Sequence, residues 1–533
     1  MADWWRGAVI YQIYPRSFCD SSGNGIGDLR GITGKLDYVA SLGVDAIWIS
    51  PFFTSPMSDF GYDVSDYRGV DPLFGDLDDF RALLRRAHEL GLKVLIDQVL
   101  SHSSDQHAWF QESRQDRSNR RADWYVWADP KADGTPPNNW LSVFGGVAWT
   151  WDSRRRQYYL HNFLSSQPDL NFHHPDVRAA QLDNLRFWLD LGVDGFRLDV
   201  VNYYFHHREL PDNPPAAGRG AAVSPGNPYG YQEHRYDVSQ PENLDYLEAL
   251  RGLLDAYPQS TSIGEIGSSD SLGDMARYTQ GGNRLHMAYT FDLLGGRSDA
   301  AYLRTVLEQV SVGLGDGWPC WSLSNHDVIR LATRWSRGLA PEQIVPAALT
   351  FLLCLRGSVC LYQGDELALP EAAVPFDRLQ DPFGRTFWPD FKGRDGCRTP
   401  MPWTADETAG FTTSGVEPWL PIGGEHRARC VAAQTAAPDS VLKQVQALLR
   451  WRREQPALSD GAQTLIDSGE IIAYLREGAG QRLLVACNLT ATAQLLPLPQ
   501  PPSRVHAPTA ACVDQVVGPV RLAPGQVLLA DLA

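Results

Sequence analysis

The chain has 533 residues, a length that exceeds one compact core and predicts two or three domains. Its formal net charge of −16 disfavours nucleic acid and anionic membranes as partners, because both require clustered lysine and arginine. The sequence has no apolar run of ~18 residues and no basic segment before an apolar one at its N-terminus. Its eight cysteines are scattered without a Cys-x-x-Cys motif. We therefore expect a cytoplasmic protein with reduced thiols, monomeric or weakly dimeric.

Oxygen-bearing residues alternate in a loop near the N-terminus, with the ligand spacing of a calcium loop in which one ligand is a backbone carbonyl. The closing bidentate glutamate of such loops is missing, since Gly31 stands there. We expect a weakly held structural Ca²⁺ or Mg²⁺, the alternative being a polar loop without metal. No phosphate-loop or dinucleotide fingerprint follows the glycines, so no organic cofactor is expected. The predicted ligands are Asp20, Ser22, Asn24, Ile26 and Asp28.

A repeated pattern predicts a parallel sheet. Three amphipathic stretches end in Leu-Gly, at Gly43, Gly91 and Gly192, and a short apolar run follows each. Glycine just past a helix is the usual left-handed cap, and apolar runs too short for helices indicate strands buried on both faces. Eight such strands fit a closed (β/α)8 TIM barrel better than an open sheet. We place them at about 8–14, 44–50, 92–98, 193–200, 259–266, 287–292, 320–325 and 357–363.

Two segments interrupt this rhythm and a third departs from it. Residues 103–167, rich in Trp, Asn, Pro and Gly, are predicted to form a small domain inserted after the third strand. Residues 207–235 are expected to form a long loop on the active face. From about residue 455, short alternating runs predict a C-terminal antiparallel β domain. The α/β barrel would then comprise residues 1–102 and 168–454, with 103–167 inserted and 455–533 at the C-terminus.

Charged residues stand at the carboxyl ends of several predicted strands, and in this barrel those ends meet on the face that carries the site. Arg197 and Asp199 alternate with apolar residues, so both point to the same side of their strand. Neighbouring strands lie ~4.8 Å apart. Asp199 and Glu265 can therefore bring their carboxyls within the ~5–5.5 Å that suits a retaining glycosidase.

In such an enzyme one carboxylate attacks the anomeric carbon and the other holds a proton. Like-charge proximity and partial burial would favour the proton, while Arg197 would keep Asp199 ionised. The alternative is a buried ion-pair network that closes the barrel. Glu265, His326 and Asp327, at the ends of further strands, favour a catalytic site instead.

With these residues in place, the chain resembles glycoside hydrolase family 13, the α-amylase family, over essentially its full length. The first motif ends in Ser101-His102 where the family usually has Asn-His, which puts the hydrogen bonding around Asp97 in doubt. Segments 11–28, 60–67 and 393–403 resemble the α-glucosidase and oligo-1,6-glucosidase branch, and 378–403 is most similar to proteobacterial transglucosylating α-glucosidases. The family motifs match at 97–102, 167–172, 195–200, 264–267, 324–327 and 364–369.

The resemblance implies roles for the matching positions. Asp199 would be the nucleophile, Glu265 the general acid/base, and Asp327 a third carboxylate that binds sugar hydroxyls beside the scissile bond. Asp59 and Arg394 would clamp the non-reducing-end hydroxyls, which implies exo-action. The other implied substrate contacts are Tyr62 as a stacking platform, His102 and His326 as hydroxyl donors, Phe163 and Gln167 as pocket lining, and Arg197.

The function that these observations favour is a retaining α-glucosidase that passes glucose from short substrates to water or another hydroxyl. Val200, after the nucleophile, often accompanies α-1,6 preference in related enzymes, whereas the wider resemblance favours α-1,4 substrates such as maltose. The alternatives are an oligo-1,6-glucosidase and an isomerase of the trehalose or isomaltulose synthase type. A non-catalytic scaffold, as in some transporter heavy chains, is disfavoured because all three carboxylates are present.

Overall fold

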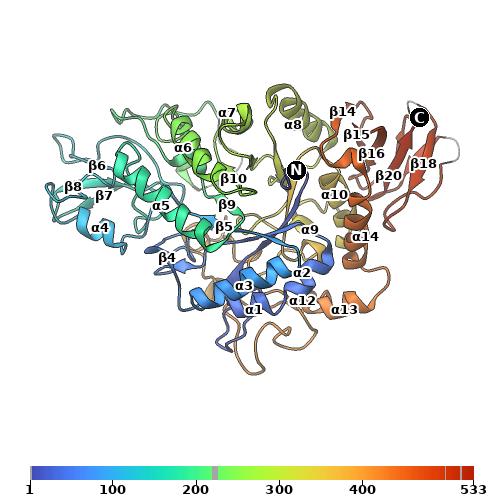
Figure 1. Ribbon diagram of the computed structural model, residues 1–533, viewed down its shortest axis with the longest axis horizontal. Coiled ribbons are helices and arrows are strands. Elements are labelled where there is room, and N and C mark those ends of the chain that lie inside the picture. The colour runs from blue at the N-terminus through green and yellow to red at the C-terminus, as the bar shows by residue number, and fades with distance from the viewer. Residues whose placement is uncertain (1–2, 219–225, 499, 517–518) are drawn as a thin grey trace.

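The computed structural model describes residues 3–218, 226–498, 500–516 and 519–533. Its centre is an eight-stranded parallel sheet in the order β11-β10-β9-β5-β2-β1-β13-β12 (Figure 1). A parallel bridge between Ala288 of β11 and Pro319, just ahead of β12, joins the two edges and closes the barrel. The strands are β1 (Val9–Ile13), β2 (Ala46–Ile49), β5 (Lys93–Gln98), β9 (Gly195–Leu198), β10 (Thr261–Ile266), β11 (Met287–Thr290), β12 (Cys320–Ser322) and β13 (Ser358–Tyr362).

Helices surround this barrel, as the predicted (β/α)8 fold requires. Gly43 and Gly192 cap α2 and α5 with φ of 91° and 102°, so the left-handed caps are confirmed. The helices are α1 (Leu29–Thr33), α2 (Leu36–Leu42), α3 (Leu77–Glu89), α5 (Pro175–Leu191), α6 (Asn243–Asp255), α7 (Ser271–Thr279), α8 (Ala300–Gly313), α9 (Leu331–Arg334), α10 (Pro341–Leu353), α11 (Pro382–Phe387), α12 (Gly424–Ala428), α13 (Val431–Ala436) and α14 (Val441–Arg453).

The barrel strands bury both faces, so alternate residues enter two different cores. Val9 and Tyr11 of β1 pack outward into the large core beneath the helices, whereas Ile10 packs into the barrel interior. Trp48 and Leu95 belong to the same interior core. The interior is therefore filled by side chains, and polar groups find room at the carboxyl ends of the strands.

The segment after β5 holds α4 (Ala108–Ser113) and a small antiparallel sheet in the order β6-β8-β7. Its strands are β6 (Trp127–Ala128), β7 (Trp149–Asp152) and β8 (Gln157–Leu160). Figure 1 shows this sheet at one end of the molecule and the C-terminal sheet at the other. These elements support the division at 103–167 and 455–533, whose boundaries stay a prediction.

The C-terminal region is antiparallel, with the five-stranded order β14-β15-β16-β20-β18 and a two-stranded β17-β19 sheet. Four of its strands were expected from their alternating pattern. The other three, β14, β18 and β19, were missed because their patterns are short or interrupted by proline. The strands are β14 (Ala462–Ile466), β15 (Ile472–Gly478), β16 (Gln481–Cys487), β17 (Gln494–Leu496), β18 (Pro502–His506), β19 (Val520–Leu522) and β20 (Val527–Leu532).

Three further observations bear on the sequence predictions. All eight cysteines are free thiols, and seven of them are buried. Within the described parts of the chain, no helix is long and apolar enough to cross a membrane. The predicted loop at 207–235 is described only in part, because residues 219–225 lie outside the described residues.

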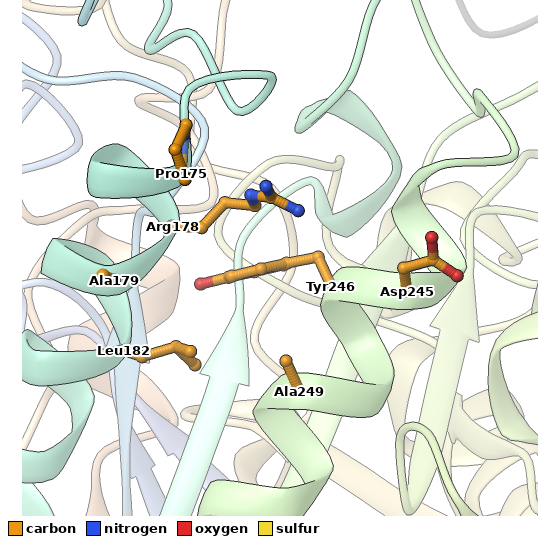
Figure 2. A pocket seen from close by; sticks show the side chains of 7 residues that line it. All are labelled: Pro175, Arg178, Ala179, Leu182, Asp245, Tyr246 and Ala249. Carbon is orange, nitrogen blue, oxygen red and sulfur yellow. The ribbon is translucent and has the colours of Figure 1, made fainter.

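A shallow groove of about 250 Å³ lies between α5 and α6 on the outer helical ring. Figure 2 shows Tyr246 across its floor, with Arg178 on α5 and Asp245 on α6 beside it. None of its lining residues is one of the strand-end carboxylates. The groove is therefore separate from the candidate site.

Candidate active site

One buried arginine gathers the strand-end carboxylates. Arg197 Nη1 donates to Asp97 Oδ1 at 2.8 Å and to Asp199 Oδ1 at 2.7 Å, and its Nη2 lies 2.6 Å from Glu265 Oε2. The guanidinium is fully buried and lies 5.0 Å from the ring centroid of Trp48 in the barrel interior. Asp199 and Glu265 thus lie against the two terminal nitrogens of the same group, as the prediction of neighbouring carboxyls requires.

Tyr289, on β11, is a further member of this cluster. Arg197 Nη2 donates to its hydroxyl oxygen at 2.8 Å, and the hydroxyl donates to Glu265 Oε1 at 2.8 Å. The other oxygen of Glu265 accepts from the backbone N–H of Val200 at 3.2 Å. Both oxygens of Glu265 are therefore held by groups on neighbouring strands.

The electrostatics of the cluster are those of crowded carboxylates. Burial raises the pKa of Asp199 well above its ordinary value, Arg197 opposes this, and the charges of Glu265 and Asp97 add to it. Burial also raises the pKa of Asp97 to about 6, again opposed by Arg197. Three carboxylates that share one guanidinium cannot all ionise easily, so burial and mutual repulsion favour a proton shared within the cluster. Arg197 lowers the pKa of Asp199 against this burial, in the direction expected from the sequence.

Val200 follows Asp199 in a left-handed backbone conformation, with φ of 35° and ψ of 55°. A β-branched residue rarely adopts this conformation, at a cost on the order of 1–3 kcal/mol. The turn ends β9 and begins the 3₁₀ helix Val201–Tyr203. The same left-handed turn directs the Val200 N–H at Glu265, so the strained backbone contacts the catalytic cluster.

A hydrogen-bond chain runs from the cluster to His326. Tyr62 donates to Asp97 Oδ2 at 3.1 Å, and its hydroxyl oxygen lies 2.6 Å from His326 Nε2. Gln12 Nε2 lies 2.8 Å from His326 Nδ1. Because the amide donates and Tyr62 gives its proton to Asp97, we assign the neutral tautomer with hydrogen on Nε2. Burial lowers the pKa of His326 well below its usual value, consistent with this neutral form.

Arg394 gathers a second set of carboxylates. Its Nη2 donates to Asp59 Oδ1 at 2.7 Å and its Nη1 to Asp327 Oδ1 at 3.1 Å. Arg398 donates to the same oxygen of Asp327 at 2.9 Å. Burial would raise the pKa of Asp327, but the positive charges of Arg394 and Arg398 hold it well below its usual range. Asp327 is therefore ionised, and the structure brings it together with Asp59 and Arg394.

The remaining predicted pocket residues lie beside Asp59. Gln167 Nε2 donates to Asp59 Oδ2 at 3.2 Å, and the ring of Phe163 lies 5.1 Å from that of His102. His102 Nε2 donates to the carbonyl of Tyr62 at 3.0 Å, and burial lowers the pKa of His102 to about 4. To donate to a sugar hydroxyl, as predicted, His102 would have to share its Nε2 hydrogen between the Tyr62 carbonyl and the sugar.

Ser101, the residue that departs from the family motif, lies 2.9 Å from His102 Nδ1 through its Oγ. With Nε2 carrying the hydrogen, Ser101 donates to Nδ1 and fixes the tautomer of His102. The second oxygen of Asp97 instead accepts from Trp48 Nε1 at 3.1 Å and from Tyr62. Both oxygens of Asp97 are therefore bonded without Ser101.

The N-terminal loop brings two of its predicted metal ligands together. Asp20 and Asp28 both accept from the N–H of Ser22, at 2.9 and 3.1 Å, so their carboxylates converge on one point. Asn24 Oδ1 instead accepts from the N–H of Ile26 at 2.8 Å. Among the described residues, no group of three or more His, Cys, Asp or Glu side chains could hold a metal. A cation at this loop would therefore have to be bound by these two carboxylates together with neutral oxygens.

Sequence reasoning missed three residues that touch this constellation: Tyr289, Asp381 and Arg398. Arg398 and Asp381 both lie in segment 378–403, which resembles transglucosylating α-glucosidases, so both had a signal in the sequence. Tyr289 lies in an apolar strand, where an aromatic residue is usually core. Nothing in its neighbourhood distinguishes it from a packing residue.

Comparison with known proteins gives concordant matches. The family model described as "Alpha amylase, catalytic domain" matches residues 12–461. A probable α-glucosidase of Rhizobium meliloti is 53% identical over 504 residues, which cover 93% of this chain and 91% of the relative. An oligo-1,6-glucosidase of Heyndrickxia coagulans is 37% identical over 92% and 93%. The crystal structure of the α-glucosyl transfer enzyme XgtA superposes with a TM-score of 0.97 at 57% identity, with both chains fully covered.

The crowded cluster makes Asp97→Asn a test of its electrostatics. The charge of Asp97 raises the pKa of Asp199, so its removal should lower that pKa and extend ionised Asp199 to lower pH. We expect the acid limb of the kcat/KM profile to move to lower pH. The value at the optimum should fall about 10- to 100-fold, because Arg197 loses a charged partner. An acid limb that stays in place or moves to higher pH would contradict this electrostatic account.

Proposed function

Since this chain belongs to the α-amylase family of glycoside hydrolases, we propose that it is an exo-acting, retaining α-glucosidase. The observation that carries the proposal is the pair of carboxyls, Asp199 and Glu265, held by the two terminal nitrogens of buried Arg197. Their common anchor favours the ~5–5.5 Å separation of retaining enzymes, which is too short to admit a water between carboxylate and sugar.

In the first step the Glu265 carboxyl gives its proton to the glycosidic oxygen as Asp199 attacks the anomeric carbon. The bond from that carbon to the leaving alcohol breaks, and a β-glucosyl ester forms on Asp199. In the second step Glu265 takes a proton from water or another hydroxyl, which attacks the same carbon and releases Asp199. Two inversions give net retention, and the acceptor hydroxyl decides between hydrolysis and transfer.

Exo-action is supported by the clamp at Asp59 and Arg394. Both groups are more than nine-tenths buried and paired at 2.7 Å, so they close the pocket on one side of the catalytic cluster. A further glucose unit on the non-reducing end would have to displace this pair. Short substrates such as maltose have no such further unit, so they satisfy this restriction.

Transglucosylation is proposed from the walls of the acceptor side. Asn227, in the described part of the 207–235 loop, is fully buried and donates to the carbonyl of Val143 in the inserted segment at 2.7 Å. Tyr229 of the same loop bonds the hydroxyl of Tyr203, whose ring lies 5.6 Å from that of Phe163. The described part of this loop thus packs against the inserted segment as one wall, and a positioned acceptor hydroxyl competes better with water.

Linkage preference is proposed to be α-1,4, with Val200 as the residue that tunes it. Its side chain follows the nucleophile, and a single methyl or hydroxyl change there shifts discrimination by only ~1–3 kcal/mol. An oligo-1,6-glucosidase is the second candidate, because the Heyndrickxia coagulans relative carries that name at 37% identity.

We also propose a cytoplasmic location, small glucosides and hydroxyl acceptors as partners, and a monomer or weak homodimer.

The N-terminal loop is proposed to bind Ca²⁺ or Mg²⁺ through Asp20, Asp28 and neutral oxygens of the loop. The support is the convergence of the two carboxylates on the Ser22 N–H. Such a cation would neutralise their charge and stiffen the loop, and it has no part in the reaction.

Asp199→Asn tests the nucleophile. The variant keeps the size of the side chain but lacks the attacking oxyanion, so turnover of p-nitrophenyl α-glucoside should fall about 1,000-fold or more. Thermal unfolding should show that the variant is folded. Substantial activity in the folded variant would overturn the assignment.

Val200→Thr tests the linkage proposal. For the unchanged enzyme we expect a higher kcat/KM on maltose than on isomaltose, and for the variant a ratio shifted further toward maltose by about 10-fold. Substrate preference and reaction products also separate the alternative functions. Preferred cleavage of isomaltose would favour the oligo-1,6-glucosidase, and isomerised disaccharides from maltose or sucrose would favour an isomerase.

Asp20→Ala tests the cation loop. Added Ca²⁺ should raise the unfolding temperature of the unchanged protein, because a ligand that binds only the native state stabilises it. The variant should lose that response. The same calcium response in both proteins would count against this site.

A further inference from the structure

The carboxylate of Asp381, which the proposed reaction does not use, engages one whole edge of the Arg394 side chain. Asp381 Oδ1 accepts from Arg394 Nη2 at 2.8 Å and from Nε at 3.2 Å, and its Oδ2 accepts from the backbone N–H of Arg394 at 2.7 Å. Asp381 is itself fully buried. The contact is therefore a dry, fork-like pairing that fixes the plane of the guanidinium as well as its position.

The donors of Arg394 can be accounted for one by one. An arginine side chain has five N–H groups. Asp381 takes the one on Nε and one on Nη2, Asp59 takes the other on Nη2, and Asp327 takes one on Nη1. None of these three carboxylates accepts the second Nη1 hydrogen. It is the donor that remains for a substrate hydroxyl beside Asp59 and Asp327.

Asp381 is in turn held firmly in place. Its backbone N–H donates to Asp395 Oδ2 at 2.9 Å, and it is the N-cap residue of α11. Gly384 of α11 packs so closely on Gly393 that an added Cβ would lie 2.7 Å from the Gly393 Cα. The helix that begins at Asp381 therefore rests directly on the backbone that carries Arg394.

The same short helix reaches the inserted segment. The ring of Phe383 lies 5.0 Å from that of Phe144, and the ring of Phe387 lies against Gly145. The Arg394 guanidinium in turn lies 5.2 Å from the ring centroid of Phe144. Asp381 thus stands where the pocket wall, α11 and Arg394 meet.

We infer that Asp381 is a positioning residue that aims the remaining Nη1 hydrogen of Arg394 at the 4-hydroxyl of the non-reducing glucose. The inference rests on the proposed function and deepens it, because the 4-hydroxyl is the one that a further α-1,4-linked unit would occupy. Asp381 does not touch the substrate. It acts by holding the Nε–Nη2 edge of Arg394, so that Asp59 and Asp327 receive the other donors in a fixed geometry.

The test compares p-nitrophenyl α-glucoside with its 4-deoxy counterpart in the unchanged enzyme and in Asp381→Asn. The unchanged enzyme should lose about 10-fold or more in kcat/KM on the 4-deoxy substrate. In Asp381→Asn, kcat/KM on the parent substrate should fall about 10- to 100-fold, mostly through KM, because the lost contact is to a non-reacting hydroxyl. The penalty for the missing 4-hydroxyl should largely disappear.

The controls separate positioning from folding. Asp381→Glu, which keeps the charge, should restore part of the 4-deoxy discrimination, and Asp377→Asn, an exposed aspartate just before α11, should behave as the unchanged enzyme. If Asp381→Asn does not fold, Asp381→Ser, which also lacks the charge, carries the comparison. Full 4-deoxy discrimination in a folded Asp381→Asn enzyme would overturn the inference, and so would an unchanged enzyme that ignores the 4-hydroxyl. Absence of any α-glucoside cleavage by the unchanged enzyme would instead overturn the proposed function.

Discussion

The site depends on one buried guanidinium, Arg197, surrounded by more negative charge than it can balance. Three carboxylates and a tyrosine contact it, and it lies on an indole in the barrel interior. A buried charge of this kind is stable only when its hydrogen bonds are satisfied, so the strands that carry its partners must keep their register. The closed parallel barrel supplies that register, and it brings the ends of β5, β9, β10 and β11 to the same side.

The clamp repeats the same principle at a second arginine. Arg394 also lies between carboxylates, and the two clusters are linked through Tyr62 and His326, whose Nε2 lies 3.3 Å from Asp327 Oδ2. Burial and the crowded negative charge at Arg197 raise the pKa of Asp199, whereas two arginines at Asp327 keep that carboxylate ionised. The connecting groups, in order, are Arg197, Asp97, Tyr62, His326, Asp327 and Arg394.

The barrel and the catalytic pair were accessible from the sequence because they follow local rules. Buried strands read as short apolar runs, and a charged residue at the end of such a run has few structural explanations. Asp199 and Glu265 stand out in this way without any resemblance to a family. The family motifs then added the clamp, which strand periodicity cannot reveal because Asp59 and Arg394 are 335 residues apart.

What the sequence could not supply were partners defined only by three-dimensional proximity. Tyr289 looks like a core residue, and the pairing of Asp381 with Arg394 depends on how an irregular segment folds back on itself. The charge balance of the cluster is hidden for the same reason, since the ratio of carboxylates to guanidinium is visible only after folding. The measurement that tests the central claim most directly is proton NMR of the first glucose released from an α-glucoside. A retaining site at Asp199 and Glu265 predicts the α-anomer before mutarotation, and initial release of the β-anomer would contradict it.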